Sequence, residues 1–240
     1  EPHITEKTRA ILLSNPGNPT GTVLTPAELR LMADIAREHG LYLICDEVYR
    51  EFIYDGAEPA TAGSFRDIDE NLILIDSVSK RFSACGARIG ALISHNRGIM
   101  QGALKLAQAR LSVATLDQLG AAALYGVDPG YFDATRNEYR RRRDTCYRKL
   151  LEIPGIVTTE PQGAFYIMLN ITGVMGKTYN GRNIDSSQTF AELLLADKHV
   201  AVVPGNAFEA EGFCRLSYAV AMESCMEGLR RIEEFVSELK

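Results

Sequence analysis

The residues best suited to chemistry centre on Lys80, which follows the apolar stretch Leu72–Ile75 in a turn that also holds Ser77 and Arg88. A free lysine amine has a pKa of about 10.4, so it becomes a nucleophile only where burial or a neighbouring cation lowers that value. Such an amine forms Schiff bases with carbonyl compounds. The guanidinium fork and the hydroxyl of the same turn suit a phosphate. The turn therefore favours a ligand that carries an aldehyde and a phosphate, and the alternative is a lysine exposed on a polar loop.

Two earlier segments also combine an apolar strand with polar residues at its end. Ile11–Leu13 precedes the densest cluster of turn-forming residues in the chain, where Asn18 and Pro19 form a plausible cis peptide. Leu41–Cys45 leads directly into Asp46, and a carboxylate at the end of a parallel strand lies where open α/β sheets bind ligands. Taken alone, the first segment could be an ordinary loop and the second a helix or turn cap.

In this order the segments resemble the signature of the class I/II aminotransferases, which are fold-type I enzymes that use pyridoxal 5'-phosphate. The resemblance covers nearly the whole chain, and the ordered set of motifs is far more specific than any one of them. The family's motifs are matched by Asn18–Gly21 for Asn-Pro-Thr-Gly, Asp46 and Tyr49 for Asp-x-x-Tyr, Ser77 and Lys80 for Ser-x-x-Lys, Arg88 and Gly90 for Arg-x-Gly, and Arg215 for the carboxylate-binding arginine.

The resemblance implies roles around the cofactor ring. Lys80 would form the Schiff base and shuttle the proton between the substrate's α-carbon and the cofactor. Asp46 would pair with the protonated pyridine nitrogen and so keep the ring able to accept electrons. Asn18 and Tyr49 would hydrogen-bond the phenolic oxygen of the ring.

The resemblance also implies which residues bind anions. Ser77 and Arg88 would hold the cofactor phosphate. Arg215 would form a bidentate pair with the α-carboxylate of the substrate, with Asn18 beside it. The loop Ser112–Thr115, where some members place a second arginine for a dicarboxylate substrate, contains no cation, although Arg110 precedes it.

Members of the resembled family begin well before the Asn-Pro-Thr-Gly strand, whereas only Glu1–Ala10 precede the first apolar strand here. We therefore expect a C-terminal portion of a longer protein. Taken alone, this portion should bind pyridoxal phosphate weakly and turn over little amino acid.

Composition is that of an ordinary globular protein, with 240 residues, 46% hydrophobic and 24% charged. A net charge of −5 argues against nucleic-acid binding through general basicity, and no apolar run is long enough to cross a bilayer. The five cysteines and four histidines show no disulfide or metal-ligand spacing. We expect no nucleic-acid partner, no membrane, no metal and a cytoplasmic location, and the resemblance adds a homodimer.

The elements that must position these residues alternate along the first half of the chain. Thr25 and Glu28 form a capping box around Pro26, and the periodic run that follows ends at Gly40. Further strand signals at Leu41–Cys45, Leu72–Ile75 and Ile89–Ser94 predict an α/β fold, with a mainly parallel sheet flanked by helices. With the resemblance, residues 1–140 are part of a large cofactor-binding domain of fold type I that is truncated.

The second half predicts a smaller α+β domain over residues 141–240. Its expected strands are Ile156–Thr159, Ala164–Leu169 and Val200–Val203, and its expected helices are 131–153, Ser187–Lys198 and Glu223–Leu239. Arg140–Arg143 should spread around the first helix as a solvated or interdomain surface. Gly173–Asn183 reads as a flexible loop. Gly163–Tyr166 matches a family strand near the substrate, and its aromatic residues fit a plain core strand equally well.

The resemblance implies the transfer of an amino group between an L-amino acid, such as aspartate or a related one, and a 2-oxo acid, through a pyridoxal phosphate Schiff base on Lys80. Two alternatives remain. One is a lyase or a cyclopropane-forming synthase of the same fold, and the other is an aminotransferase-like regulatory domain that senses the cofactor or an amino acid.

Overall fold

The computed structural model describes residues 3–58 and 60–240, which form two compact units. Unit 1 contains the chain up to Gly17 and residues Thr22–Ala134, and unit 2 contains Asn18–Gly21 and Thr135–Lys240. A four-stranded sheet lies in each unit.

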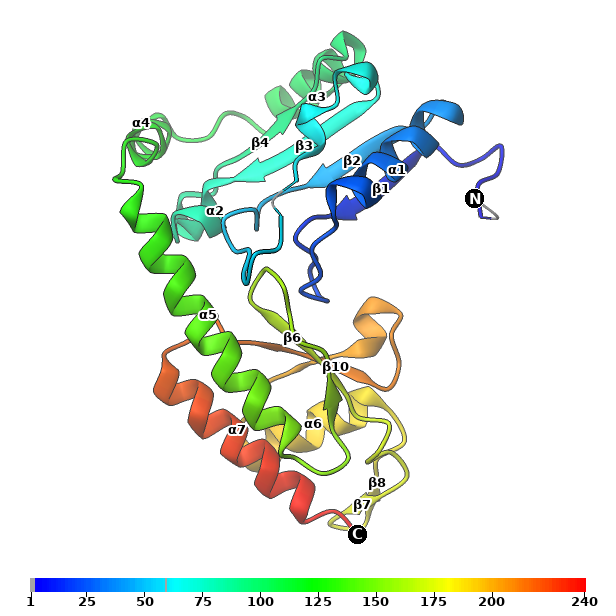
Figure 1. The fold of residues 1–240 in the computed structure, drawn as a ribbon, viewed down its shortest axis with the longest axis vertical. Helices are drawn as coiled ribbons and strands as arrows, with labels where there is room; N and C mark the ends of the chain where they lie inside the picture. Colours follow the sequence, from blue (N-terminus) through cyan, green and yellow to red (C-terminus); the bar gives the residue numbers. More distant parts are fainter. Residues whose placement is uncertain (1–2, 59) are drawn as a thin grey trace. The chain divides into compact units, whose positions relative to one another are not determined.

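The sheet of unit 1 is mainly parallel, as predicted (Figure 1). Its strands, in spatial order, are β1 (Ala10–Ser14), β2 (Tyr42–Asp46), β3 (Leu72–Ser77) and β4 (Gly90–Ile93). The first three run parallel and β4 runs antiparallel to β3, with Gly90 paired to Ser77. The ends of β2 and β3 and the start of β4 therefore meet at one edge of the sheet.

Helix α1 (Pro26–Glu38) joins β1 to β2 and begins at the predicted capping box. Thr25 Oγ1 accepts from the Glu28 amide at 3.2 Å, and the Glu28 carboxylate accepts from the Thr25 amide at 2.8 Å. These bonds satisfy donors that a helix start leaves without partners. The apolar face of the helix packs with β2 in the main core of the unit, which includes Leu29, Ala33, Ala36, Leu43 and Cys45.

Three more helices of unit 1 follow β3 and β4. The one-turn helix α2 (Val78–Arg81) continues directly from β3. Helices α3 (Arg97–Ala109) and α4 (Thr115–Leu124) come after β4 and were not predicted, and α3 has no buried residue. The short 3-10 helices of this unit are η1 (Ala62–Ser64), η2 (Arg66–Ile68) and η3 (Cys85–Ala87).

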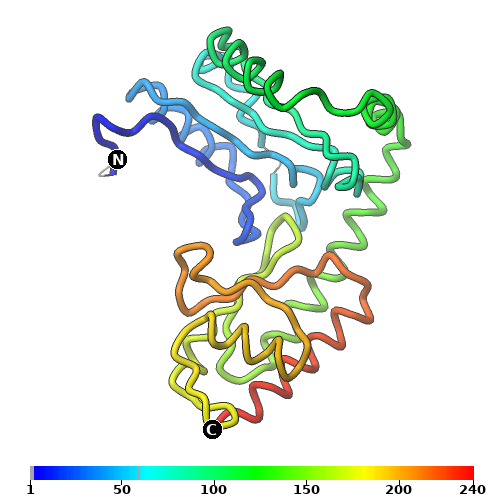
Figure 2. Tube along the Cα trace, turned by 180° about the vertical axis from the view of Figure 1, so that it is seen from behind, coloured from blue at the N-terminus to red at the C-terminus, as the bar shows by residue number. Residues whose placement is uncertain are grey.

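The three helices predicted for the second half are confirmed. They are α5 (Gly130–Leu151), α6 (Ser187–Lys198) and α7 (Met222–Ser237). In unit 2, α7 runs alongside the later turns of α5, as both the ribbon in Figure 1 and the reverse view in Figure 2 show.

The sheet of unit 2 is antiparallel and completes the expected α+β arrangement. Its strands, in spatial order, are β5 (Val157–Thr158), β6 (Tyr166–Asn170), β10 (Phe213–Ser217) and β9 (Val203–Pro204), and the 3-10 helix η4 (Gly205–Phe208) follows β9.

The segment Gly173–Asn183, predicted as a flexible loop, contains a small hairpin of β7 (Thr178–Tyr179) and β8 (Arg182–Asn183). Its two turn residues, Asn180 and Gly181, have φ of 48° and 80°. Asn-Gly is the strongest short-range hairpin signal, since both positions of a type I′ turn need positive φ. The loop prediction overlooked that dipeptide.

The predicted arginine surface of α5 is wrong for Arg143, which is only 2% exposed. Its Nη1 donates to the carbonyl of Pro161 at 2.5 Å and its Nε to Asp144 at 2.6 Å. Because consecutive helix residues point about 100° apart, one of four arginines in a row must face the side on which the helix packs.

Among the described residues, no helix combines the length and apolar character needed to span a membrane.

Candidate active site

Five of the seven predicted site residues lie at the strand-end edge of unit 1, and they are Asp46, Tyr49, Ser77, Lys80 and Arg88. Asp46 ends β2 and Ser77 ends β3, and these two strands are parallel neighbours. Arg88 precedes β4, which starts at the same edge. The other two predicted residues, Asn18 and Arg215, belong to unit 2.

Lys80 is half-buried on α2, and its Nζ lies 6.0 Å from the centroid of the Tyr49 ring. The tyrosine itself is buried. Helix α2 is capped at its N-terminus by Ser77, whose hydroxyl accepts from the Ser79 amide at 2.9 Å. This cap starts the single turn that carries the lysine out of the sheet edge.

The two acids after β2 have different surroundings. Asp46 is half-buried and accepts from the amide of Val48 at 3.1 Å. Glu47 is buried, and its carboxylate accepts from the Thr61 hydroxyl at 2.8 and 2.9 Å and from the Ala62 amide at 3.0 Å. Burial raises the pKa of Glu47, although these hydrogen bonds oppose the shift. Glu47 thus anchors the turn that follows Asp46.

Ser77 and Arg88 line one cavity of about 750 Å³, which also includes Arg110. Arg88 is exposed, has a left-handed backbone with φ of 56°, and donates from Nη1 to the Cys85 carbonyl at 2.9 Å. The Ser77 hydroxyl donates to the Ile89 carbonyl at 3.2 Å. Two cations and a hydroxyl that could bind a phosphate line this cavity, together with the carboxylates of Asp76 and Asp117.

In unit 2, the guanidinium of Arg215 lies between two aromatic rings. Its central carbon is 4.5 Å from the centroid of the Tyr166 ring and 4.9 Å from that of Phe208. Its Nη1 donates to Asn18 Oδ1 at 2.8 Å, while its Nε is buried and has no hydrogen-bond partner. A buried N–H of a charged group without a partner costs free energy unless an anion binds there.

Asn18 reaches Arg215 from a turn that contains two cis peptide bonds, Asn15–Pro16 and Asn18–Pro19. The second of these was expected from the sequence. The carbonyl of Gly21, at the end of the Asn-Pro-Thr-Gly motif, accepts from the amides of Gln162 and Gly163, each at 2.8 Å. These two bonds hold the motif within unit 2.

Comparison with known proteins identifies the family. The profile described as "Aminotransferase class I and II" matches residues 1–232. The chain belongs to this family. The expected resemblance and fold are therefore confirmed.

The relatives of this aminotransferase chain include a "Probable aspartate/prephenate aminotransferase" of Aquifex aeolicus, 36% identical over 98% of the chain. The "Aromatic-amino-acid aminotransferase 2" of Thermococcus litoralis is also 36% identical, over 100% of the chain. The crystal structure of the aspartate aminotransferase from Rhizobium meliloti superposes with a TM-score of 0.90 at 31% identity, over 99% of this chain and 60% of that one. The chain spans 59% and 60% of the length of the first two relatives.

Sequence reasoning missed Asp76, which stands one residue before Ser77. Its carboxylate binds both Arg50 and Arg81, which follow Tyr49 and Lys80 directly in the chain. The available signal was weak, since an acid beside a motif and two arginines in neighbouring turns are common in any chain.

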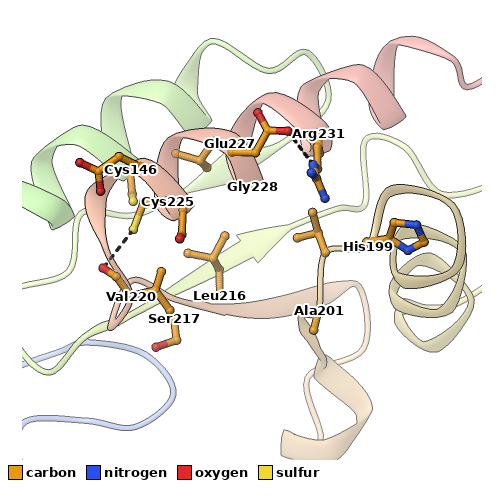
Figure 3. Close-up of a pocket in the computed structure, with 14 residues that line it drawn as sticks. Cys146, His199, Ala201, Leu216, Ser217, Val220, Cys225, Glu227, Gly228 and Arg231 are labelled. Carbon is orange, nitrogen blue, oxygen red and sulfur yellow. Dashed lines mark hydrogen bonds and ion pairs between the residues drawn. The ribbon is translucent and has the colours of Figure 1, made fainter.

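A second cavity of this aminotransferase chain, of about 550 Å³, lies in unit 2 beside α7 (Figure 3). Cys146 and Cys225 line it with their thiols turned toward each other. A hydrogen bond from Cys146 lowers the pKa of Cys225 to about 7, and the same bond raises that of Cys146. None of the seven predicted site residues lines this cavity, so the candidate active site lies elsewhere.

Proposed function

We propose that the full-length protein transfers an amino group between an L-amino acid and a 2-oxo acid, with pyridoxal phosphate bound covalently to Lys80. The observation that carries the proposal is Arg215, whose flat guanidinium lies between two rings and keeps one buried N–H without a partner. This geometry suits the α-carboxylate of an amino acid, because a carboxylate accepts two parallel hydrogen bonds from an arginine.

The residues of unit 1 fit pyridoxal phosphate by the chemistry of their donors. Lys80 supplies the amine, Asp46 a carboxylate for the ring nitrogen, and Tyr49 a hydroxyl for the ring oxygen. Ser77 and Arg88 line one cavity and can bind the phosphate. When bound, the cofactor withdraws electrons from the substrate carbon that carries the amino group.

Each side chain then has a defined task. Lys80 Nζ would take the proton from the substrate's α-carbon and return it on the other side of the transfer. Asn18 Oδ1 accepts from Arg215, so its amide NH2 is the group that can donate to the ring oxygen. Arg215 would bind the α-carboxylate of the substrate and so fix the orientation of the amino acid.

The test is an absorbance titration of the full-length protein. Pyridoxal phosphate should give a visible band that an amino-acid substrate removes, and Lys80→Ala should form no such band. Arg215→Gln should keep the band and need roughly 10- to 100-fold more amino acid to remove it, since a charge-assisted hydrogen bond contributes about 1.5–3 kcal/mol. Arg182→Gln is the control, because Arg182 is an exposed cation of the same unit that pairs with Glu192. Unchanged amino-acid affinity in Arg215→Gln would reject the assigned role.

The proposed substrate is aspartate or a related amino acid, in line with relatives named for aspartate and for aromatic amino acids. Comparing kcat/KM for aspartate and for phenylalanine tests this preference. Identification of the product also separates amino-group transfer from the alternatives. Transfer would release a 2-oxo acid, whereas a lyase or a ring-forming synthase would release an eliminated or cyclised compound. We further propose a cytoplasmic homodimer, which light scattering and fractionation can test. That the 240 residues alone turn over little amino acid stays a prediction.

A further inference from the structure

Asp76 is a buried carboxylate that joins three parts of unit 1. Its Oδ2 accepts from Arg50 Nη2 at 2.8 Å and from Arg81 Nη2 at 2.9 Å. Its Oδ1 accepts from the amide of Ser77 at 2.8 Å. One side chain near the end of β3 thus binds the turn after β2, the helix α2 and its own strand end.

The two arginines are chain neighbours of the proposed active-site residues. Arg50 follows Tyr49 and Arg81 follows Lys80. The lysine amine lies 6.0 Å from the tyrosine ring centroid. Asp76 therefore ties together, through its two partners, the two backbone segments that bring this amine and this ring near each other.

Helix α2 needs such a tie because it has only four residues. Short helices are unstable in isolation, since the cost of the first turn is not recovered by further hydrogen bonds. Arg81 is buried, and its guanidinium is held by Asp76 and lies 3.5 Å from Glu51. Successive helix residues point about 100° apart, so fixing Arg81 on one side of the turn also fixes the direction of Lys80.

The charges of the cluster depend on Asp76 as well. Arg50 lies 3.9 Å from the buried Glu47, and Arg81 lies 3.5 Å from Glu51, so each arginine has a second and longer ion pair. Asp76 is the carboxylate that both share, at under 3 Å. Without it, the buried Arg81 and the exposed Arg50 would keep only their longer ion pairs, and the two turns would be held together less tightly.

We propose that Asp76 is a positioning residue, which acts through Arg50 and Arg81 to hold Lys80 and Tyr49 in the arrangement that the aminotransferase reaction requires. The role rests on the proposed function. It concerns the contacts among Asp76, Arg50 and Arg81, and it predicts that loosening this cluster changes the geometry of the lysine-bound cofactor.

Unit 1 contains a more exposed counterpart of this cluster that serves as a control. Asp67, on η2, also binds two arginines of helix α1, Arg30 at 2.8 Å and Arg37 at 2.6 Å. Asp76→Asn is therefore compared with Asp67→Asn. Arg50→Gln is compared with Arg37→Gln, because the two arginine side chains are 41% and 48% exposed and their loss should leave the fold intact.

The first measurement is hydrogen exchange of the full-length protein without cofactor. In Asp76→Asn and Arg50→Gln, the amide of Phe52, which donates to the Tyr49 carbonyl at 2.8 Å, should exchange at least tenfold faster. In Asp76→Asn the amide of Phe82, which donates to Val78 at 3.2 Å, should do the same. Both controls should exchange there like the wild type.

The second measurement is the circular dichroism of the visible band per bound pyridoxal phosphate, together with steady-state kinetics. The test variants should lose at least half of this signal, and kcat should fall about 10- to 100-fold while KM changes less than threefold, because misplacement of about 1 Å costs this much in rate. A general loss of stability would lower the melting temperature without changing the signal per bound cofactor.

In Arg50→Gln, wild-type exchange at the Phe52 amide or an unchanged visible signal would overturn the positioning role even if Asp76→Asn did not fold. If the wild-type protein forms no visible band with pyridoxal phosphate, the proposed function fails and the inference fails with it. If the wild type forms the visible band and the variants match it in exchange and in signal per bound cofactor, the positioning role alone is rejected.

Discussion

Gly21, the last residue of the Asn-Pro-Thr-Gly motif, is a position where a single added methyl group should disturb the candidate site. Its φ is +71°, and a Cβ there would lie 2.6 Å from Pro161 Cβ and 3.1 Å from the Tyr166 carbonyl. Its own carbonyl accepts from the amides of Gln162 and Gly163. Gly21→Ala must therefore push the motif away from the chain that holds it.

The size of the effect follows from two separate costs. A left-handed backbone costs an L-residue roughly 1–2 kcal/mol relative to glycine. Forcing a methyl group into closely packed surroundings adds about 1–3 kcal/mol. Gly176 supplies the control in the same unit, because its φ is +83° and a Cβ there would meet nothing within 4 Å. Gly176→Ala should cost about 1–2 kcal/mol and Gly21→Ala roughly 2–5 kcal/mol.

Urea denaturation followed by circular dichroism measures both variants against the wild type. The same shift should move Asn18 away from Arg215 and raise the KM for the amino acid about tenfold, since one charge-assisted hydrogen bond is weakened. Gly176→Ala should leave the KM unchanged. A Gly21→Ala protein no less stable than Gly176→Ala would show that the packing against Pro161 is not tight, and the reasoning would fail.

Three further outcomes are expected. Because burial raises the pKa of Glu47, its carboxyl stabilises the fold below its unfolded pKa of about 4.3, and this contribution is lost as pH rises through the higher folded value. Wild type should thus lose stability relative to Glu47→Gln as the pH rises above about 4.3, and parallel curves would contradict this. Alkylation of Cys225, followed by peptide mapping, should have its midpoint near pH 7 and move to higher pH in Cys146→Ala, because the donor that stabilises the thiolate is gone. Arg143→Met should lower the free energy of unfolding by roughly 1–3 kcal/mol, because the bond to the Pro161 carbonyl is lost. The same change at the exposed Arg141 should lower it by less than about 0.5 kcal/mol, and equal losses would contradict the role of burial.

Elements whose signals lie close together in the sequence could be predicted well. The capping box around Pro26 marked the start of α1, and the helix Ser187–Lys198 has the predicted bounds. Both depend on neighbouring residues, through caps and apolar periodicity, and need no knowledge of the rest of the chain. The hairpin at Asn180 was not predicted, although its Asn-Gly turn signal is equally local.

Contacts between distant residues could not be predicted from local signals. Arg215 and Asn18 are 197 residues apart, and only the family resemblance suggested that both serve one substrate. The tie between Asp76 and Arg50 spans 26 residues and left no pattern in the sequence. Arg143 was placed on the surface because the sequence does not state which side of α5 would pack against Pro161.

The described residues divide the proposed chemistry between the two units. Lys80 and Asp46 lie at the sheet edge of unit 1, where strand order alone brings the cofactor-type groups together. Arg215 and Asn18 bond directly within unit 2, where the Tyr166 and Phe208 rings lie 4.5 and 4.9 Å from the guanidinium carbon. Because each set is organised by contacts of its own unit, substitutions in unit 1 should chiefly alter the cofactor band. Substitutions in unit 2 should chiefly alter the amino-acid concentration needed to remove it.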